Sequence, residues 1–262
     1  YRKLCDTAEF IAASFEKAGY RLRRQEYQID GKICTNIDAE IAGSTRPDDI
    51  VVIGGHYDTV LDCPGANDNG TGVAALLALA RAFAHKKPTH TLRFVAFVNE
   101  EPPYFQTPQM GSYVYAKGCR ERSDNIVAML SLETIGYFTD AQRSQDYPFP
   151  LAAFFPPVGN FIAMVANRRS GKVLKKFTDT FRHHSEFPLI DGAFPRAVAG
   201  IGWSDQWAFW QHDYPGMMIT DTAPFRYPFY HTPEDTPDKI HFEHFTRLVV
   251  GLEKALAGFS PH

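Results

Sequence analysis

Carboxylates and imidazoles follow the ends of several apolar runs in this sequence. They are His56 and Asp58, Glu100 and Glu101, Glu133, and Asp221 with His231 a short way after it, while Asp68 lies in a glycine-rich loop. If these positions share one edge of a sheet, they form a basin of carboxylates with two imidazoles, which like-charge repulsion would destabilise without a counter-charge. Two divalent metal ions would neutralise it. Imidazole and carboxylate ligands without thiolate suit catalytic zinc, with manganese or cobalt as substitutes.

Two metal ions held close together need a bridging carboxylate, and they hold a water molecule whose pKa falls from about 15.7 to about 7. A nearby carboxylate that binds no metal can then take the proton, which is worth about 10²–10⁴-fold in rate. The doublet Glu100-Glu101 offers one residue for each task, because adjacent residues after a strand point in different directions. The reaction class that this predicts is metal-assisted hydrolysis of an amide.

The elements that must position these residues can be predicted from hydrophobic patterning. Residues 50–55 form an apolar run that breaks into glycine, which is typical of a strand buried on both faces. Residues 73–83 are rich in Ala and Leu with a broad apolar face, which predicts a helix. His56 and Asp58 would therefore lie at the carboxyl end of a parallel strand, the edge where open α/β sheets bind ligands.

The remaining elements follow from the same patterns. We expect strands at 20–29 and 33–41, joined as an antiparallel hairpin at a sheet edge, and further strands at 92–98, 126–132, 161–166 and 216–220. We expect helices at 1–19, from 112, at 171–184, at 203–210 with Ser204 or Asp205 as N-cap, and at 241–259. A Pro- and Phe-rich stretch at about 137–160 shows no period and is predicted to be a surface excursion. The alternation predicts one α/β domain over residues 1–262, with a mixed, mostly parallel twisted sheet flanked by helices.

Composition bounds the class of protein. The 262 residues are 44% hydrophobic and 22% charged, with a formal net charge of −3, so no basic surplus indicates a nucleic-acid partner or a membrane surface. No apolar run reaches the ~18 residues of a membrane-spanning helix. Cys5, Cys34, Cys63 and Cys119 form no CxxC pair, which argues against thiolate zinc sites and leaves disulfides open. The chain opens inside a helical pattern, so we expect it to be trimmed, and compartment and oligomeric state stay open.

Six motifs carry a more specific resemblance. They are GGHYDT (54–59), GANDNGTG (65–72), NEE (99–101), SLET (131–134), SDQWAF (204–209) and YHTPEDT (230–236), in this order over residues 50–240. The set resembles the co-catalytic zinc exopeptidase family of bacterial leucyl-type aminopeptidases. Glutaminyl cyclases, glutamate carboxypeptidase and transferrin-receptor ectodomains share its fold, so the resemblance implies a zinc-exopeptidase domain of the phosphorylase/hydrolase-like type.

The resemblance also implies roles for the matching positions. Asp68 would bridge two zinc ions, His56 and Glu133 would complete one site, and Glu101 and His231 would complete the other. One position departs from the family pattern. The residue at the position of Glu133 is more often Asp, and the extra methylene can change the coordination geometry or the metal preference.

Two further roles follow from the same resemblance. Glu100 would act as general base and then as acid to the leaving amine, and Asp58 would orient the imidazole of His56. Three local alternatives stay open. Asp205 either caps its helix or belongs to the surroundings of the site. Tyr230 either donates a hydrogen bond to the oxyanion or packs against the wall of the site. The excursion at 137–160 either forms an apolar substrate pocket, covers the sheet edge or makes a dimer contact.

The expected function is that of a di-zinc aminopeptidase acting on peptides with a free N-terminus. One rival is a glutaminyl cyclase, an acyltransferase that keeps one zinc ion and needs fewer ligands. The other is a non-catalytic binding domain, which would have lost ligands. The complete set of five, including His56 and Glu133, favours the hydrolase. Side-chain preference, and aminopeptidase against carboxypeptidase or dipeptidase activity, stay open at this stage.

Overall fold

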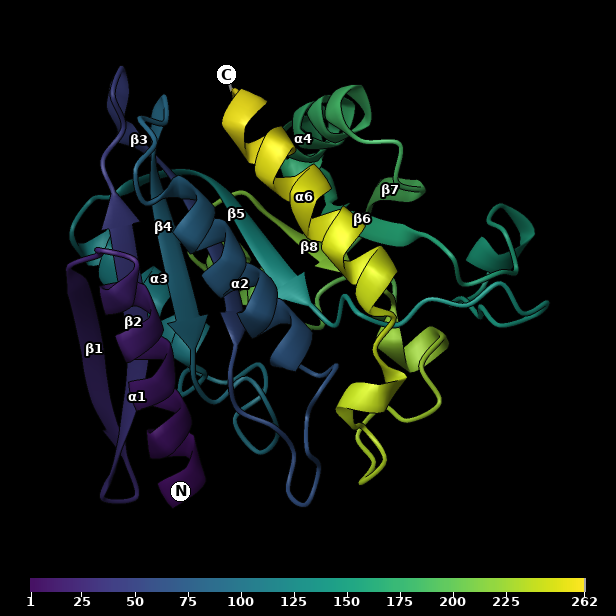
Figure 1. The fold of residues 1–262 in the computed structure, drawn as a ribbon, viewed down its shortest axis with the longest axis horizontal. Coiled ribbons are helices and arrows are strands. Elements are labelled where there is room, and N and C mark those ends of the chain that lie inside the picture. The colour runs from purple at the N-terminus through teal and green to yellow at the C-terminus, as the bar shows by residue number, and fades with distance from the viewer. Residues whose placement is uncertain (262) are drawn as a thin grey trace.

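The architecture is one eight-stranded sheet between two layers of helices (Figure 1), seen in a computed structural model that describes residues 1–261. The strands are β1 (Leu22–Ile29), β2 (Lys32–Ile41), β3 (Arg46–His56), β4 (His90–Phe97), β5 (Asn125–Glu133), β6 (Ile162–Asn167), β7 (Leu189–Phe194) and β8 (Gly216–Thr220). The helices are α1 (Arg2–Lys17), α2 (Gly70–Phe83), α3 (Gly111–Glu121), α4 (Gly171–His184), α5 (Gln206–Gln211) and α6 (Phe242–Gly258).

The sheet has the order β1-β2-β4-β3-β5-β8-β6-β7. Strands β4, β3, β5 and β8 are parallel neighbours. On one side, the antiparallel β1–β2 hairpin joins β4 through an antiparallel β2–β4 pairing. On the other side, β6 is antiparallel to β8 and parallel to β7. This confirms the predicted mixed sheet with a parallel centre and a hairpin at its edge. The registers bring the carboxyl ends of the central strands to one edge, since His56 pairs with Phe97 and Glu133 pairs with Thr220.

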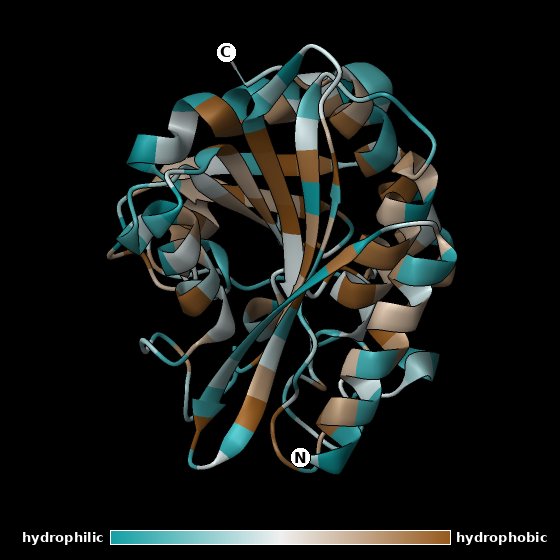
Figure 2. Cartoon of the chain, turned by 90° about the vertical axis from the view of Figure 1, so that its left-hand side faces the viewer, coloured by the Kyte–Doolittle hydropathy of each residue, from teal (hydrophilic) through white to brown (hydrophobic). Residues whose placement is uncertain are grey.

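Apolar side chains of the central strands pack on both faces of the sheet. On β3, Val51 and Ile53 belong to the large core that also contains residues of α1, α2, α4 and α6. Ile50 and Val52 point the other way, into a smaller core with residues of α3 and α5. Seen from the β1 side, hydrophobic colour concentrates on the strands between the helices (Figure 2). The prediction of a strand buried on both faces is therefore confirmed.

The structure differs from the predicted elements, or completes them, at several positions. β7 was not predicted, because LIDGAF is short, shows no alternation and contains a glycine. Asp205 occupies the N-cap position of α5, but its side chain makes no capping hydrogen bond. Within the excursion over residues 137–160, the regular secondary structure is one short 3-10 helix, Leu151–Ala153. All four cysteines are unpaired.

Among residues 1–261, no helix combines the length and the hydropathy that crossing a membrane requires.

Candidate metal centre and active site

The five predicted ligands lie together at the carboxyl edge of the sheet. His56 ends β3, Glu133 ends β5, Glu101 follows β4, Asp68 precedes α2, and His231 lies in the loop after β8. The Nε2 atom of His56 is 3.4 Å from Oδ1 of Asp68 and 3.3 Å from Oε2 of Glu133. The Nε2 atom of His231 is 3.0 Å from Oδ2 of Asp68 and 3.3 Å from Oε1 of Glu101.

The carboxylate of Asp68 lies between the two groups and turns one oxygen to each. His56 Nε2, both Asp68 oxygens and Glu101 Oε1 are buried without a hydrogen-bond partner, which is costly unless another group binds them. Four ligands held tetrahedrally at about 2.0–2.1 Å from a zinc ion lie about 3.3 Å from one another. The observed separations fit that geometry, and the donor set of imidazole and carboxylate fits zinc.

Charges within the cluster shift the titration of both imidazoles. Burial alone would lower the pKa of His231, but the carboxylates of Asp68 and Glu101 beside its Nε2 atom raise it to about 10. Burial likewise opposes the charged form of His56, yet Glu133 and Glu100 raise its pKa well above the ordinary value. Cations in the site would have to displace these protons, so metal binding is coupled to pH.

The backbone around Asp68 is held by a buried carboxylate from a distant part of the chain. Asp235 accepts hydrogen bonds from the backbone N–H of Asn67 at 2.8 Å and of Asp68 at 3.1 Å, and from the hydroxyl of Tyr227 at 2.7 Å. Asp235 is fully buried. The loop therefore presents Asp68 to the site through contacts with the segment that carries His231.

Asn69 joins the start of α2 to the end of β5. Its Oδ1 accepts from the backbone N–H of Gly72 at 3.1 Å and of Thr134 at 3.0 Å, and its Nδ2 donates to the carbonyl of Leu132 at 2.8 Å. A Cβ atom on Gly72 would lie 2.5 Å from that same carbonyl oxygen, so glycine permits the close approach. These contacts fix the distance between the loop of Asp68 and the strand of Glu133.

Asp58 acts on the site in two ways. Its backbone carbonyl is 3.0 Å from Nδ1 of His56, which must donate because a carbonyl oxygen only accepts, and this leaves Nε2 of the neutral ring free to bind metal. Its carboxylate is farther from Nδ1, at 3.6 Å, and instead accepts from the backbone N–H groups of Glu100 and Glu101, each at 3.1 Å. The side chain predicted to orient the imidazole therefore holds the Glu100-Glu101 turn, while the backbone carbonyl of the same residue contacts the imidazole.

Glu100 lies beside the ligands but farther from His56 than Glu133 does. Its Oε2 is 3.8 Å from His56 Nε2. Burial raises the pKa of Glu100 well above its ordinary value, and the charges of Glu133, Asp205 and Glu101 act in the same direction against the lowering effect of His56. A buried carboxyl group whose pKa is raised in this way can both accept and return a proton.

Two serines support Glu133, and sequence reasoning missed both. The Ser204 hydroxyl donates to Oε2 of Glu133 at 2.6 Å. Because that proton is used, the hydroxyl of Ser131, 2.9 Å away, must donate to Ser204. Both serines are fully buried. The sequence held part of the information, because Ser131 lies in the SLET motif and Ser204 in the SDQWAF motif. The sequence pattern does not indicate that these two motifs are in contact.

The structure places two other acidic residues outside the ligand cluster. Asp221 is fully buried and accepts from Nδ2 of Asn67 at 2.9 Å and from the backbone N–H of Tyr137 at 2.8 Å, so it braces the Asp68 loop. Burial raises its pKa to about 7. Asp205 is fully buried with both carboxylate oxygens free of hydrogen bonds, and burial raises its pKa to about 7 as well.

The ring of Tyr230 stacks on the ring of His231, with centroids 3.8 Å apart and an interplanar angle of 18°. Burial raises the pKa of the Tyr230 hydroxyl, so this group stays a hydrogen-bond donor. Tyr230 also lines an adjacent cavity. The stacking accounts for a packing role and leaves the predicted oxyanion role as a second possibility for the same side chain.

Known proteins resemble this chain in sequence and in fold. Residues 36–250 match the model of peptidase family M28. The uncharacterized protein YfbL of Escherichia coli is 35% identical over 255 residues, covering 94% of this chain and 77% of that protein. An aminopeptidase from Aneurinibacillus sp. strain AM-1 superposes with a TM-score of 0.64 at 26% identity, covering 85% of this chain and 47% of its own.

A third protein shares the fold at low sequence identity. Glutaminyl cyclase from Bacteroides thetaiotaomicron has a TM-score of 0.70 at 14% identity, covering 99% of this chain and 91% of that one. At this identity the likeness concerns the fold alone. The family match covers most of the chain, and the identity to YfbL extends over nearly all of it. The chain therefore belongs to peptidase family M28, a family of zinc-dependent hydrolases that act on peptide bonds.

Proposed function

We propose that this chain is an aminopeptidase that holds two zinc ions and hydrolyses the N-terminal peptide bond of its substrate. The observation that carries the proposal is the carboxylate of Asp68, which offers one oxygen to the His56–Glu133 side and the other to the His231–Glu101 side. Its unpartnered buried oxygens support a bridging role. The name of the Aneurinibacillus relative supports aminopeptidase chemistry on this fold.

The proposed division of labour uses residues already described. Asp68 would bridge, His56 and Glu133 would hold one ion, and His231 and Glu101 would hold the other. When bound, the ions would supply Lewis acidity and a nucleophilic hydroxide at neutral pH. Manganese or cobalt would be the expected substitutes for zinc.

Glu100 is proposed to move the proton. It would accept a proton from the attacking water and deliver it to the amine that leaves. Its burial and raised pKa support this role, because a raised pKa makes the carboxylate a stronger base. Asp58 would keep Glu100 in place through the hydrogen bond to its backbone N–H.

A glutaminyl cyclase activity is the second candidate, and the shared fold is the observation in its favour. Those enzymes keep one zinc ion, whereas here His56 lies next to both Oδ1 of Asp68 and Oε2 of Glu133, so that these three residues form a second ligand group. The full ligand set favours the hydrolase. A non-catalytic binding domain is disfavoured for the same reason.

The decisive variant is Glu100→Gln, with Glu121→Gln as matched control, because Glu121 is an exposed glutamate on α3. We expect Glu100→Gln to keep its zinc and to lose at least about 100-fold in kcat, while the control behaves as the parent. A zinc-loaded, folded Glu100→Gln protein with parental turnover would refute the assigned role. Peptides blocked at the amino end should resist cleavage and peptides blocked at the carboxyl end should not, which separates aminopeptidase from carboxypeptidase activity.

A further inference from the structure

Charge is distributed unevenly along this chain. Residues 168–184 contain six lysine and arginine residues against one aspartate, whereas the other 245 residues contain 21 basic and 29 acidic residues. With histidine neutral, the net charge of −3 therefore combines a segment of +5 with a remainder of −8. The six basic residues are Arg168, Arg169, Lys172, Lys175, Lys176 and Arg182. An excess of this size on one segment attracts anionic partners although the chain as a whole is acidic.

The fold displays these basic side chains on one surface. Most of the segment is α4, whose buried residues are Leu174, Phe177, Thr178 and Phe181. Their spacing of three and four residues defines one side of the helix, and the apolar members of that side belong to the large core. Lys172 and Lys175 on the other side are exposed, and Lys176 is partly exposed. We call this exposed side of α4, together with Arg168 and Arg169, the cationic face.

Internal ion pairs neutralise part of the cationic face. The pairs are Arg169 with Asp213, Lys175 with Asp179, and Arg182 with Asp191. The first two join exposed side chains, and such pairs are weak. Arg168, Lys172 and Lys176 have no ion-pair partner within residues 1–261. Three positive charges on this face are therefore available to a partner.

Helix α6 lies beside α4 over the same face of the sheet (Figure 1). The two helices are in close contact, since a Cβ atom on Gly251 of α6 would lie 2.9 Å from the ring of Phe181 on α4. The outer side of α6 presents Arg247, Val250 and Lys254, which are all exposed. This helix contains two acidic and two basic residues. It therefore extends the surface with an apolar group and adds no net negative charge.

The cationic face lies away from the metal centre. Strand β6 is antiparallel to β8, so its last residue, Asn167, and Arg168 after it lie at the sheet edge opposite the ligands. Along β6, Met164 and Ala166 belong to the large core that α4 covers, whereas Val165 between them faces the cavity on the other side of the sheet. A partner bound to α4 therefore leaves the metal centre uncovered.

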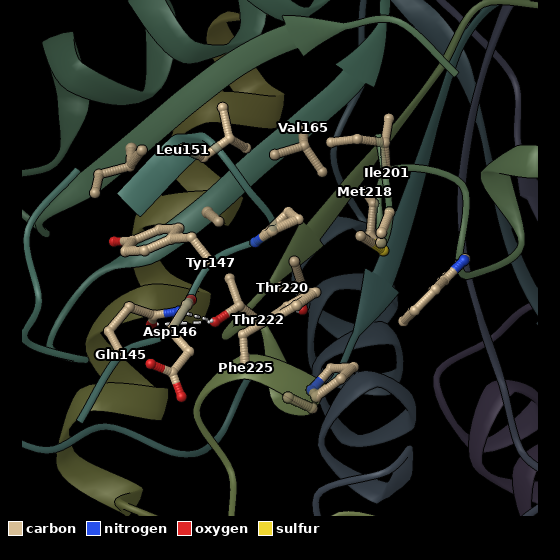
Figure 3. Close-up of a pocket in the computed structure, with 18 of the residues that line it drawn as sticks. Gln145, Asp146, Tyr147, Leu151, Val165, Ile201, Met218, Thr220, Thr222 and Phe225 are labelled. Atoms are coloured by element: carbon tan, nitrogen blue, oxygen red, sulfur yellow. Dashed lines mark hydrogen bonds between the residues drawn. The ribbon is translucent and has the colours of Figure 1, made fainter. Parts of the chain in front are cut away.

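The excursion over residues 137–160 lies on the cavity side of the sheet. Figure 3 shows Val165 and Met218 on the strands of the cavity, with Tyr147 and Leu151 of the excursion beside them. Of the alternatives that the sequence left open for the excursion, the structure favours the wall of an apolar cavity. Access to the metal centre from this side does not pass α4.

Lipid with anionic headgroups fits the cationic face better than nucleic acid does. Clusters of about four to eight Lys and Arg residues on an amphipathic helix are typical of binding to such lipid. Elements that read duplex DNA enter a groove, whereas α4 lies flat on the sheet. Single-stranded nucleic acid stacks on exposed aromatic rings, whereas Phe177 and Phe181, the phenylalanines of α4, are fully buried. A lipid surface needs neither feature, and its interfacial region accepts an apolar group such as Val250.

We propose that the cationic face, with the outer side of α6 beside it, binds a membrane surface that contains anionic phospholipid. Binding is peripheral and electrostatic. It weakens with salt, because the range of the charges falls from about 10 Å at 0.1 M to about 3 Å at 1 M. It is independent of the proposed peptidase function, because no residue of the cationic face belongs to the ligand groups of the metal centre.

The test measures sedimentation of the protein with vesicles of phosphatidylcholine alone or mixed with phosphatidylglycerol. At about 0.1 M salt we expect binding to the mixed vesicles, little binding to phosphatidylcholine, and release near 1 M. Each basic residue close to an anionic surface contributes about fivefold to the partition coefficient. The combined substitution of Arg168→Glu, Lys172→Glu and Lys176→Glu should therefore lower partition into the mixed vesicles by at least about 100-fold.

The matched control combines Arg2→Glu, Lys3→Glu and Arg21→Glu. It makes the same change in net charge at exposed positions at the start of α1 and just before β1, and it should keep most of the parental binding. Circular dichroism and thermal unfolding identify any variant that fails to fold. A glutamine version of the α4 substitutions removes the three charges without reversing them, and should lower partition by about 10–100-fold. It decides the test if the glutamate version does not fold.

Binding to the mixed vesicles that the α4 variant loses and the control keeps would support the inference. Absence of binding at about 0.1 M salt, equal binding to phosphatidylcholine alone, or equal losses in both variants would overturn it. Duplex DNA and polyglutamate are the comparison probes. Binding to either of them without binding to the mixed vesicles would also overturn the assignment to lipid. All these measurements need no turnover, so the proposed function stands or falls separately.

Discussion

Replacing Ser204 by alanine removes the hydrogen bond that its hydroxyl donates to Glu133 at 2.6 Å in a fully buried position. It also leaves the hydroxyl of Ser131 without the partner 2.9 Å away. Hydrogen bonds to charged groups contribute about 1.5–3 kcal/mol. We therefore expect the affinity for the ion on the His56–Glu133 side to fall by about 10–100-fold. The ion on the His231–Glu101 side should keep its affinity, because Ser204 does not contact those ligands.

The assay is a zinc titration by calorimetry or by competition with a chromophoric chelator, resolved into two binding steps. Ser170→Ala is the matched control. Ser170 is also buried and its hydroxyl accepts from the backbone N–H of Gly216, but it lies at the amino end of β8, away from the site. We expect this control to lower stability slightly and to leave both zinc steps unchanged. Equal losses at both steps, or no loss at either, in Ser204→Ala would refute the reasoning.

Three more predictions concern the residues that hold and charge the site. Asp58→Asn should keep zinc but lower kcat by about 10–100-fold. The substitution replaces one of the two oxygens that accept from the backbone N–H groups of Glu100 and Glu101 by an NH₂ group, which can only donate. Parental kcat would contradict this prediction. Asp235→Asn should lower the free energy of unfolding by about 1.5–3 kcal/mol in urea titrations and reduce zinc content, since Asp235 holds the loop of Asp68; unchanged values would argue against that role. Without zinc, after chelator treatment, the pKa of His231 is raised from 6.5 to about 10, so its ion pairs stabilise the fold fully below pH 6.5 and lose this effect as the pH rises toward 10. Urea unfolding should therefore show a free energy of unfolding that declines over this pH range. A His231→Asn variant should lack the share of the decline that comes from His231.

The position of the site followed from sequence because it depends on backbone regularity. Runs such as 50–55 and 126–132 identify parallel strands, and parallel strands bring their carboxyl ends to one edge. His56 and Glu133 could be placed together on that ground alone. The ligand roles needed the ordered motifs as well, because a strand end by itself does not distinguish a metal ligand from a solvated carboxylate.

What could not be predicted depends on side-chain contacts between distant segments. The hydrogen bond from Ser204 to Glu133 connects two motifs that are far apart in the sequence. The hydrogen bond that Asp235 accepts from the backbone N–H of Asp68 likewise connects two distant loops. Asp221 directly follows β8, yet its side chain turns toward Asn67 and away from the ligand cluster. β7 escaped prediction because its six residues carry neither alternation nor a buried apolar run.

Two zinc ions bridged by Asp68 are the proposed occupancy of this site. Its most direct test is zinc content by elemental analysis of dialysed protein after zinc has been offered, with hydrolysis of leucine anilide measured on the same sample. The geometry predicts about two zinc ions per chain, with activity that a chelator removes and zinc restores. One zinc ion per chain with full hydrolysis, or one zinc ion with cyclisation of N-terminal glutamine in place of hydrolysis, would contradict it.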